Sequence, residues 1–137
     1  MIAAVAPVAG VLGIDESECA PARPIPLMHL HGTGDALVPV DGGGLAGSPT
    51  VAESTEGWLE RNGCTGAPTV TYQKGAATCE TVDQCEGGAV VTLCLIEGAG
   101  HCWPGQPCRM LGDLGEPTTD IDANEAMWAF FSTVKLL

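Results

Sequence analysis

Basic residues are scarce in this sequence. Only 5 of its 137 residues are Lys or Arg, whereas 17 are Asp or Glu, and the formal net charge is −12. Proteins that bind nucleic acids or anionic membrane surfaces do so with clustered Lys and Arg side chains. The charge balance therefore excludes nucleic acid as a partner and disfavours an anionic membrane surface.

Long apolar runs are also missing, because no stretch reaches the roughly 18 to 20 residues that span a bilayer. The first 13 residues, MIAAVAPVAGVLG, are apolar enough for the core of a signal peptide. They lack the preceding Lys or Arg and the small-residue cleavage site that a signal peptide carries. Together with the segments that follow, residues 2–8 are therefore predicted to form a buried strand.

Cysteine is abundant by comparison. Seven cysteines are more than a cytosolic domain of this length usually holds, and fewer than a disulfide-dense miniprotein has. We therefore expect an exported protein, secreted or periplasmic, with two or three disulfides and at least one cysteine left over. With 45 % apolar residues, the chain is long enough to bury the core of one domain.

The order of the predicted elements indicates an α/β fold. Apolar or alternating runs predict strands at residues 2–8, 25–30, 69–73 and 89–96. Capping-box patterns predict helices that begin after Thr50 and Asp122 and end near Asn62 and Val134. Residues 78–88 are predicted to be a polar loop. Strands that alternate with helices favour an α/β sheet over a β-sandwich.

The apolar positions of the two helices predict which faces are buried. In the first helix the expected inward residues are Val51, Thr55, Trp58 and Leu59. In and before the second helix they are Ile121, Met127, Trp128, Phe130 and Phe131.

Asp35 and His101 are the strongest candidates for catalysis. Each follows an apolar strand in a Gly-rich turn, HGTGD at 31–35 and EGAGH at 97–101. Sites in open α/β sheets lie where strands end, so both side chains are expected at one edge of one sheet, within or near hydrogen-bond reach. A carboxylate there fixes the tautomer of the imidazole and stabilises its protonated form. The alternative to a catalytic role is that Asp35 only stabilises its turn as an Asx-turn carboxylate and that His101 is a structural histidine.

The other two histidines are expected to be structural. His29 lies inside an apolar run, which favours a buried core histidine, and His31 opens a tight turn whose backbone its ring can bond. The spacing of His101, Cys102 and Cys108 matches no zinc pattern, so neither a metal nor another cofactor is expected.

No serine lies where a hydrolase nucleophile is required. The acid-then-histidine order is that of α/β-hydrolases, in which a G-x-S-x-G elbow between a strand and a helix comes first. Only Ser17 precedes Asp35, and its acidic neighbours oppose an alkoxide. The remaining serines lie before or on predicted helices, at Ser48, Ser54 and Ser132.

Several segments together carry a family resemblance. They are AAVAPVAG at 3–10, PARPIPLMHLHGTGDALVPVDGG at 21–43, WLERNGC at 58–64, TCE with a further Cys at 78–85, EGAGHCWPG at 97–105 and IDANEAMWAFF at 121–131. In this order they cover nearly the whole chain, which resembles the C-terminal half of an extracellular polyhydroxybutyrate depolymerase-type esterase. That family also contains feruloyl esterases. The motifs HGTxD…VP and GxGHxWPG are specific as a pair.

The resemblance implies a partial α/β-hydrolase sheet, built of C-terminal strands and helices, as a single unit over residues 1–137. It implies hydrolysis of carboxylic esters, with Asp35 as the triad acid and His101 as the general base. It also implies that the serine nucleophile, most of the oxyanion-hole loop and several strands lie upstream of Met1. Gly34 stands at a position that varies in the family, and it is expected to add flexibility beside Asp35.

The cysteines depart from the family pattern. Cys102 and Cys108 fall in a turn that is usually free of cysteine, and they are close enough in sequence to pair and stiffen the loop that bears His101. Cys19 is the best candidate for a thiol whose partner lies upstream. Two disulfides are predicted, with all three pairings open, among Cys64, Cys79, Cys85 and Cys94.

Three functional hypotheses follow. The chain is the acid-and-histidine portion of a serine esterase, or a non-catalytic remnant whose Gly-rich rim binds a small ligand, or one half of a split esterase. Trp103 is predicted either to line an acyl or aryl pocket for the ester or to pack against Pro104. Missing neighbours would leave residues 2–8 as an unpaired apolar edge, so a homo-oligomer joined there, or aggregation, is expected.

Overall fold

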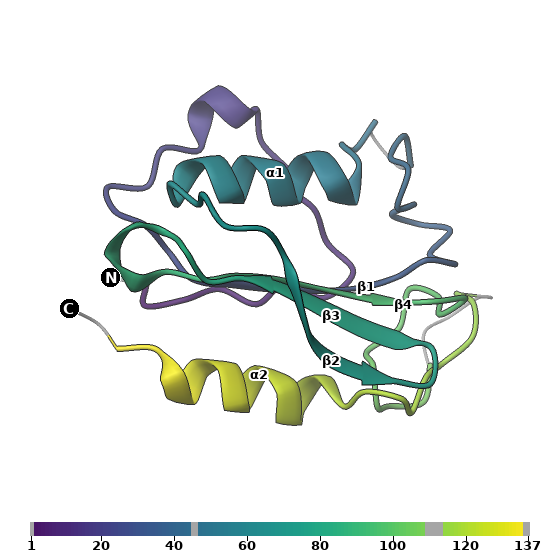
Figure 1. The fold of residues 1–137 in the computed structure, drawn as a ribbon. Helices are drawn as coiled ribbons and strands as arrows, with labels where there is room; N and C mark the ends of the chain where they lie inside the picture. Colours follow the sequence, from purple (N-terminus) through teal and green to yellow (C-terminus); the bar gives the residue numbers. More distant parts are fainter. Residues whose placement is uncertain (1, 45–46, 109–113, 136–137) are drawn as a thin grey trace.

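Four strands form one mixed sheet in the computed structural model, which describes residues 2–44, 47–108 and 114–135 (Figure 1). The strands are β1 (Leu27–Gly32), β2 (Thr69–Lys74), β3 (Ala77–Val82) and β4 (Val91–Ile96), in the sheet order β1-β4-β3-β2. β1 and β4 are parallel, whereas β3 is antiparallel to both of its neighbours. The predicted α/β class is therefore confirmed at the level of a mixed sheet with helices.

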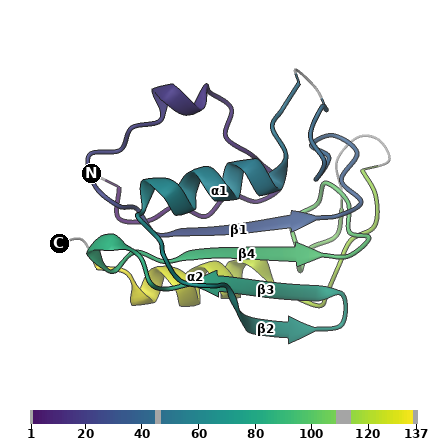
Figure 2. The same cartoon turned by 45° about the horizontal axis from the view of Figure 1, so that its top comes forward.

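Two helices of 11 residues cover opposite faces of this sheet (Figures 1 and 2). α1 (Val51–Arg61) begins with the predicted capping box, because Thr50 Oγ1 accepts from Glu53 N and Glu53 Oε2 accepts from Thr50 N. α2 (Ala123–Thr133) begins after Asp122, whose Oδ1 accepts from two backbone amides of the first turn. Two short 3₁₀ helices complete the elements, η1 (Glu16–Glu18) and η2 (Glu86–Gly88).

The main apolar core lies between the sheet and α2. Its buried members come from β1, β3 and β4, from the segment between β4 and α2, and from the first residue of α2, and they are Leu30, Ala77, Cys79, Cys94, Ile96, Ala99, Ile121 and Ala123. The prediction for α2 was wrong at Trp128 and Phe131, which are 74 % and 37 % exposed. The buried stripe runs through Ala123 and Phe130, and Trp128 lies about 100° round the helix from its neighbour Met127.

On α1 the prediction holds for Val51, which is buried, while Trp58 and Leu59 are half-buried. Ser54 is buried although it was not predicted to be. Its Oγ accepts a hydrogen bond of 3.1 Å from Leu12 N, which ties the N-terminal segment to this helix. A small hydroxyl therefore occupies a core-facing position because it satisfies a loop amide.

Residues 4–9 run parallel to β1 along the outer side of the sheet, but they do not form the regular strand predicted at 2–8. Isolated bridges join Val5 to Leu27 and Val8 to Leu30. Four backbone hydrogen bonds of 2.9 or 3.0 Å connect this segment to β1 and the residue before it. The ladder is interrupted because Pro7 has no amide hydrogen to donate.

β3 occupies part of the stretch that was predicted to be a polar loop, so that prediction was wrong. Ala77, Cys79 and Val82 are buried, whereas Glu80 is exposed. Three polar residues, Thr78, Glu80 and Thr81, interrupt the apolar residues of ATCETV, so the sequence shows no clear alternation. Gly75, with a φ of 53°, lies in the hairpin turn between β2 and β3.

Three disulfides connect the chain. Cys102 is bonded to Cys108, as predicted, and the four remaining candidates pair as Cys64–Cys85 and Cys79–Cys94. Cys19 has a free thiol. Three disulfides fit an extracellular protein, because such bonds persist in oxidising compartments. In the described part of the chain, neither helix has the length and apolar character that a membrane span requires.

Candidate active site

The turn after β1 positions Asp35 at the edge of the sheet. Gly32 and Gly34 leave no room for side chains there, because a Cβ atom would lie 2.1 Å from the Ala99 carbonyl oxygen and 2.8 Å from that of Gly98, respectively. The Gly34 amide donates to the Ala99 carbonyl at 2.9 Å. Gly34 thus serves close contact between two turns, which corrects the expectation that it adds flexibility beside Asp35.

The turn after β4 brings His101 to the same edge. β1 and β4 are parallel neighbours, so their carboxyl ends lie side by side (Figure 2). The His101 amide donates to the Leu114 carbonyl at 2.7 Å, and a Cβ on Gly100 would lie 1.9 Å from that carbonyl oxygen. The Cys102–Cys108 disulfide closes the loop that follows.

The two side chains meet in a hydrogen bond. His101 Nδ1 lies 2.8 Å from Asp35 Oδ2, and the expected contact is therefore present. The other carboxylate oxygen, Oδ1, accepts from the amides of Leu37 and Val38 at 2.9 and 2.8 Å. The Asp35 side chain is fully buried, whereas 24 % of the His101 side chain is exposed. Three donors thus hold the carboxylate in place, and the imidazole reaches solvent.

This geometry fixes the tautomer of His101. An ionised carboxylate only accepts hydrogen bonds, so the proton of the neutral imidazole lies on Nδ1. Nε2 then carries the lone pair, and it makes no hydrogen bond to any of the described residues. A histidine held this way can take a proton at Nε2, because the carboxylate stabilises the imidazolium that forms.

Two buried histidines continue the polar network behind Asp35. His31 Nε2 lies 2.8 Å from the Val38 carbonyl oxygen and 3.6 Å from Asp35 Oδ2, and His31 Nδ1 lies 3.0 Å from His29 Nε2. A carbonyl only accepts, so His31 carries its proton on Nε2 and His29 donates to Nδ1. Burial, followed by the neighbouring His31, lowers the pKa of His29 to about 4.

The predicted structural roles of His29 and His31 are confirmed, since both rings are buried and hydrogen-bonded. Sequence reasoning missed that His31 also lies beside Asp35. The spacing of four residues between them, across the turn that follows β1, is the signal that would have shown it.

Trp103 lies on the surface beside this site. Its ring is 42 % exposed, and its Nε1–H donates to Asn124 Oδ1 in the first turn of α2 at 3.2 Å. Pro104, by contrast, is buried. An exposed indole that is anchored by its polar atom presents an apolar face next to the histidine loop.

The amino-acid sequence of the chain is similar to those of two proteins that are named as esterases. No protein-family profile matches it. It is 37 % identical over 111 residues to "Feruloyl esterase B" of Piromyces equi, an alignment that covers 74 % of this chain and 20 % of that protein. It is 30 % identical over 122 residues to "Putative esterase NocK" of Nocardia uniformis subsp. tsuyamanensis, covering 75 % of this chain and 36 % of that protein.

The chain is a distant relative of esterases. The matched region spans about a fifth of the first relative and about a third of the second.

None of the four serines of this esterase relative forms a hydrogen bond with His101 among the described residues. Ser17 Oγ instead donates to Asp15 at 2.6 Å, and the hydrogen bonds from Ser17 lower the pKa of Asp15. The carboxylate therefore stays ionised beside this hydroxyl and opposes an alkoxide. Ser132 Oγ donates to the Trp128 carbonyl within α2.

The geometry also shows the state of the two cysteines near His101. Cys102 and Cys108 are joined in a disulfide, so neither can supply a thiolate ligand. Within the described ranges, no three His, Cys, Asp or Glu side chains lie close enough to hold a metal ion.

Proposed function

We propose that this chain is the acid-and-histidine portion of a serine ester hydrolase of the α/β-hydrolase type, exported to the cell exterior or the periplasm. The observation that carries the proposal is the 2.8 Å contact between His101 Nδ1 and the buried carboxylate of Asp35 at the carboxyl ends of two parallel strands. The names of the two esterase relatives support the same reaction class. The serine nucleophile comes from polypeptide outside the present sequence.

The roles of the two residues follow from their protonation. The serine oxygen attacks the ester carbonyl carbon while His101 Nε2 takes the hydroxyl proton, and Asp35 stabilises the imidazolium. When the tetrahedral intermediate collapses, the carbon–oxygen bond to the alcohol breaks and Nε2 returns the proton to the departing oxygen. Water then attacks the acyl-serine, with Nε2 again accepting and returning one proton, so the acid and the free serine are released.

Trp103 is the substrate-contacting residue in this proposal. Trp103 follows His101 by two residues in the sequence, its indole is exposed, and its Nε1–H donates to Asn124 Oδ1. A flat apolar surface of this kind suits the acyl or aryl part of an ester. Aromatic esters such as feruloyl esters, which appear in the name of one relative, and polyesters such as polyhydroxybutyrate are the substrate classes to compare.

A chimera tests the proposal. The matched part of feruloyl esterase B is replaced by the corresponding residues of this chain, and hydrolysis of p-nitrophenyl and feruloyl esters is measured. We expect turnover that His101→Ala lowers by about 10⁴-fold or more. Ser132→Ala, on the exposed side of α2, is the matched control and leaves the rate unchanged. A chimera that is folded by circular dichroism, yet hydrolyses neither ester, contradicts the proposal.

A further inference from the structure

His31 lies behind Asp35, out of reach of a substrate. Both side chains are fully buried, and His31 Nε2 lies 3.6 Å from Asp35 Oδ2. A catalytic residue must touch the substrate or the reacting atoms, and of the two histidines beside Asp35 only His101 is partly exposed. His31 can therefore influence a reaction only through the groups that it contacts.

The backbone of Val38 is the group that His31 holds. His31 Nε2 lies 2.8 Å from the Val38 carbonyl oxygen, and because a carbonyl only accepts, the ring donates. The amide of the same residue donates to Asp35 Oδ1 at 2.8 Å. Val38 is thus fixed at both of its backbone groups, its carbonyl by His31 and its amide by Asp35.

The local turn alone does not account for this arrangement. The hydrogen bond from the Leu37 amide to Asp35 Oδ1 is an Asx turn, which an aspartate forms with its own loop. The hydrogen bond from His31 to Val38 spans seven residues, and it joins β1 to the loop that follows. It therefore fixes the loop relative to the sheet, and the carboxylate with it.

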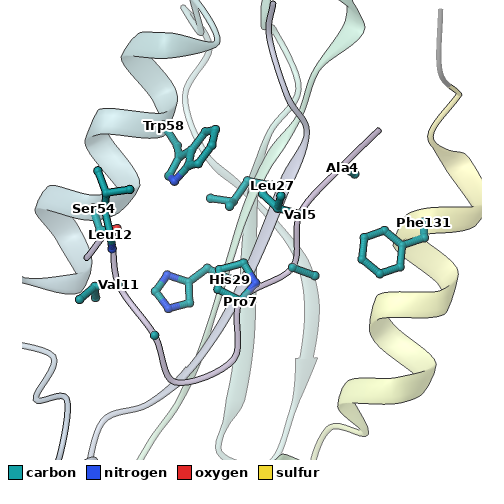
Figure 3. A pocket seen from close by; sticks show the side chains of 12 residues that line it. Ala4, Val5, Pro7, Val11, Leu12, Leu27, His29, Ser54, Trp58 and Phe131 are labelled. Carbon is teal, nitrogen blue, oxygen red and sulfur yellow. Dashed lines mark hydrogen bonds between the residues drawn. The ribbon is translucent and has the colours of Figure 1, made fainter. Parts of the chain in front are cut away.

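His29 determines which nitrogen of His31 carries the proton. Its Nε2 lies 3.0 Å from His31 Nδ1. The His29 ring also lines a pocket of about 440 Å³ with Leu27 and Trp58, and none of the residues that line this pocket is charged (Figure 3). Such surroundings favour the neutral ring, which donates from Nε2 to His31 Nδ1. The single proton of His31 is then on Nε2.

We propose that His31 is a positioning residue for Asp35 and His101. By donating to the Val38 carbonyl, it holds the loop that carries Asp35 and so keeps Oδ2 on His101 Nδ1. Its neutral state matters as well, because a charged ring 3.6 Å from Oδ2 would compete with His101 for the carboxylate. The effect on catalysis rests on the proposed function, whereas the effect on the carboxylate rests on the geometry alone.

Two amide substitutions separate the contacts of His31. The nitrogen of a glutamine side chain occupies the position of Nε2, so His31→Gln keeps a donor for Val38 and loses the acceptor for His29. An asparagine amide occupies the position of Nδ1, so His31→Asn keeps an acceptor for His29 and loses the donor for Val38. Only His31→Asn should disturb Asp35.

Hydrogen exchange of the chain, followed by nitrogen–proton correlation spectra, measures the disturbance. In His31→Asn we expect the amide protons of Leu37 and Val38 to exchange about tenfold faster or more, because the loop loses its hydrogen bond to β1. The Nδ1 proton of His101 should exchange faster by a similar factor. In His31→Gln all three rates should stay within about twofold of those of the parent chain.

Thr92→Val is the matched control for lost stability. Thr92 is buried near the start of β4, and its hydroxyl forms a hydrogen bond of 2.9 Å with that of Thr81. The variant removes one buried hydrogen bond from the same sheet, whereas His101 follows the other end of β4. The exchange rates at Leu37, Val38 and His101 should therefore stay as in the parent chain.

In the feruloyl esterase B chimera, the same variants separate positioning from substrate binding. His31→Asn should lower kcat by about tenfold with KM unchanged, because Asp35 acts when the imidazolium forms. His31→Gln should recover most of that loss. A folded chimera that hydrolyses no ester contradicts the proposed function, and the exchange rates of the present chain then decide the role of His31.

Three outcomes overturn the proposal. If the spectra of the unaltered chain place the His31 proton on Nδ1, the ring does not donate to Val38, and this measurement needs no variant to fold. If His31→Asn is folded by circular dichroism and exchanges at Leu37 and Val38 as Thr92→Val does, His31 only fills the core. If His31→Gln exchanges as fast as His31→Asn, the donor on Nε2 is not what holds the loop.

Discussion

The proton on His101 Nδ1 depends on the charge of Asp35. Asp35→Asn keeps an oxygen for the amides of Leu37 and Val38, so its NH₂ group must face His101. Because NH₂ only donates, we expect Nδ1 to become the acceptor and the proton to move to Nε2. In a complete esterase that tautomer cannot accept the serine proton, and kcat should fall by about 10⁴-fold.

Nitrogen–proton correlation spectra of the imidazole rings distinguish the two tautomers in the isolated chain. Asp41→Asn, an exposed carboxylate in the following loop, is the control and should leave the His101 pattern unchanged. If Asp35→Asn also leaves the proton on Nδ1, the tautomer has another cause than the carboxylate.

His29 links stability to pH. Its pKa is about 4 in the folded chain against 6.5 for the free group, so the unfolded chain binds the proton first as pH falls. The native state therefore loses stability as pH falls from about 6.5 toward 4, and the loss stops once the folded state also binds the proton. Between pH 7 and 5 this amounts to about 2 kcal/mol.

Urea unfolding at the two pH values measures the effect. In His29→Gln, which keeps an NH₂ donor for His31 Nδ1, the difference between pH 7 and 5 should be smaller by about 2 kcal/mol. An equal pH dependence in both proteins would show that other groups cause it.

At the scale of elements, the contact between the turns after β1 and β4 determines the site. Gly32→Ala would place a methyl group 2.1 Å from the Ala99 carbonyl oxygen, so the two turns must separate. We expect a loss of about 1–3 kcal/mol of unfolding free energy and a longer distance between Asp35 and His101. Gly13→Ala is the control, because its Cβ would meet no atom within 4 Å. Equal stability of the two variants would contradict the close contact.

The elements that could be predicted from sequence are those with a local signal. Capping residues fixed the starts of both helices, and the apolar runs gave β1 and β4. β3 was missed because Thr78, Glu80 and Thr81 interrupt its apolar residues, and the burial of Ala77, Cys79 and Val82 follows from tertiary packing that the local sequence does not show. Trp128 was misplaced for a similar reason, since apolar character alone does not say which flank of a helix the sheet covers.

At the scale of the whole molecule, the predicted meeting of Asp35 and His101 rests on parallel neighbouring strands, a relation that the α/β pattern already implies. The polar network behind it could not be predicted, because the tautomers of His29 and His31 follow from distances between rings. The disulfide pairing of the four central cysteines likewise depends on the β3–β4 register, in which Cys79 faces Cys94.

The isolated chain should not react as a serine hydrolase. No serine hydrogen-bonds His101 in the described ranges, so a fluorophosphonate probe should label none of the four serines. Mass spectrometry of the treated protein is the measurement. Stoichiometric labelling of one serine that His101→Ala abolishes would reveal a nucleophile within this chain.

The disulfides Cys64–Cys85 and Cys79–Cys94 enclose overlapping loops, since each bond has one cysteine inside the loop of the other. In strong denaturant, the two disulfides therefore keep residues 64–94 compact, while the segments before residue 64 and after residue 94 expand freely. Asp35 lies before this cross-linked region and His101 lies after it, so no disulfide holds the two residues together and only non-covalent contacts do. Heating or mild denaturant should thus separate Asp35 from His101 first, while residues 64–94 stay compact.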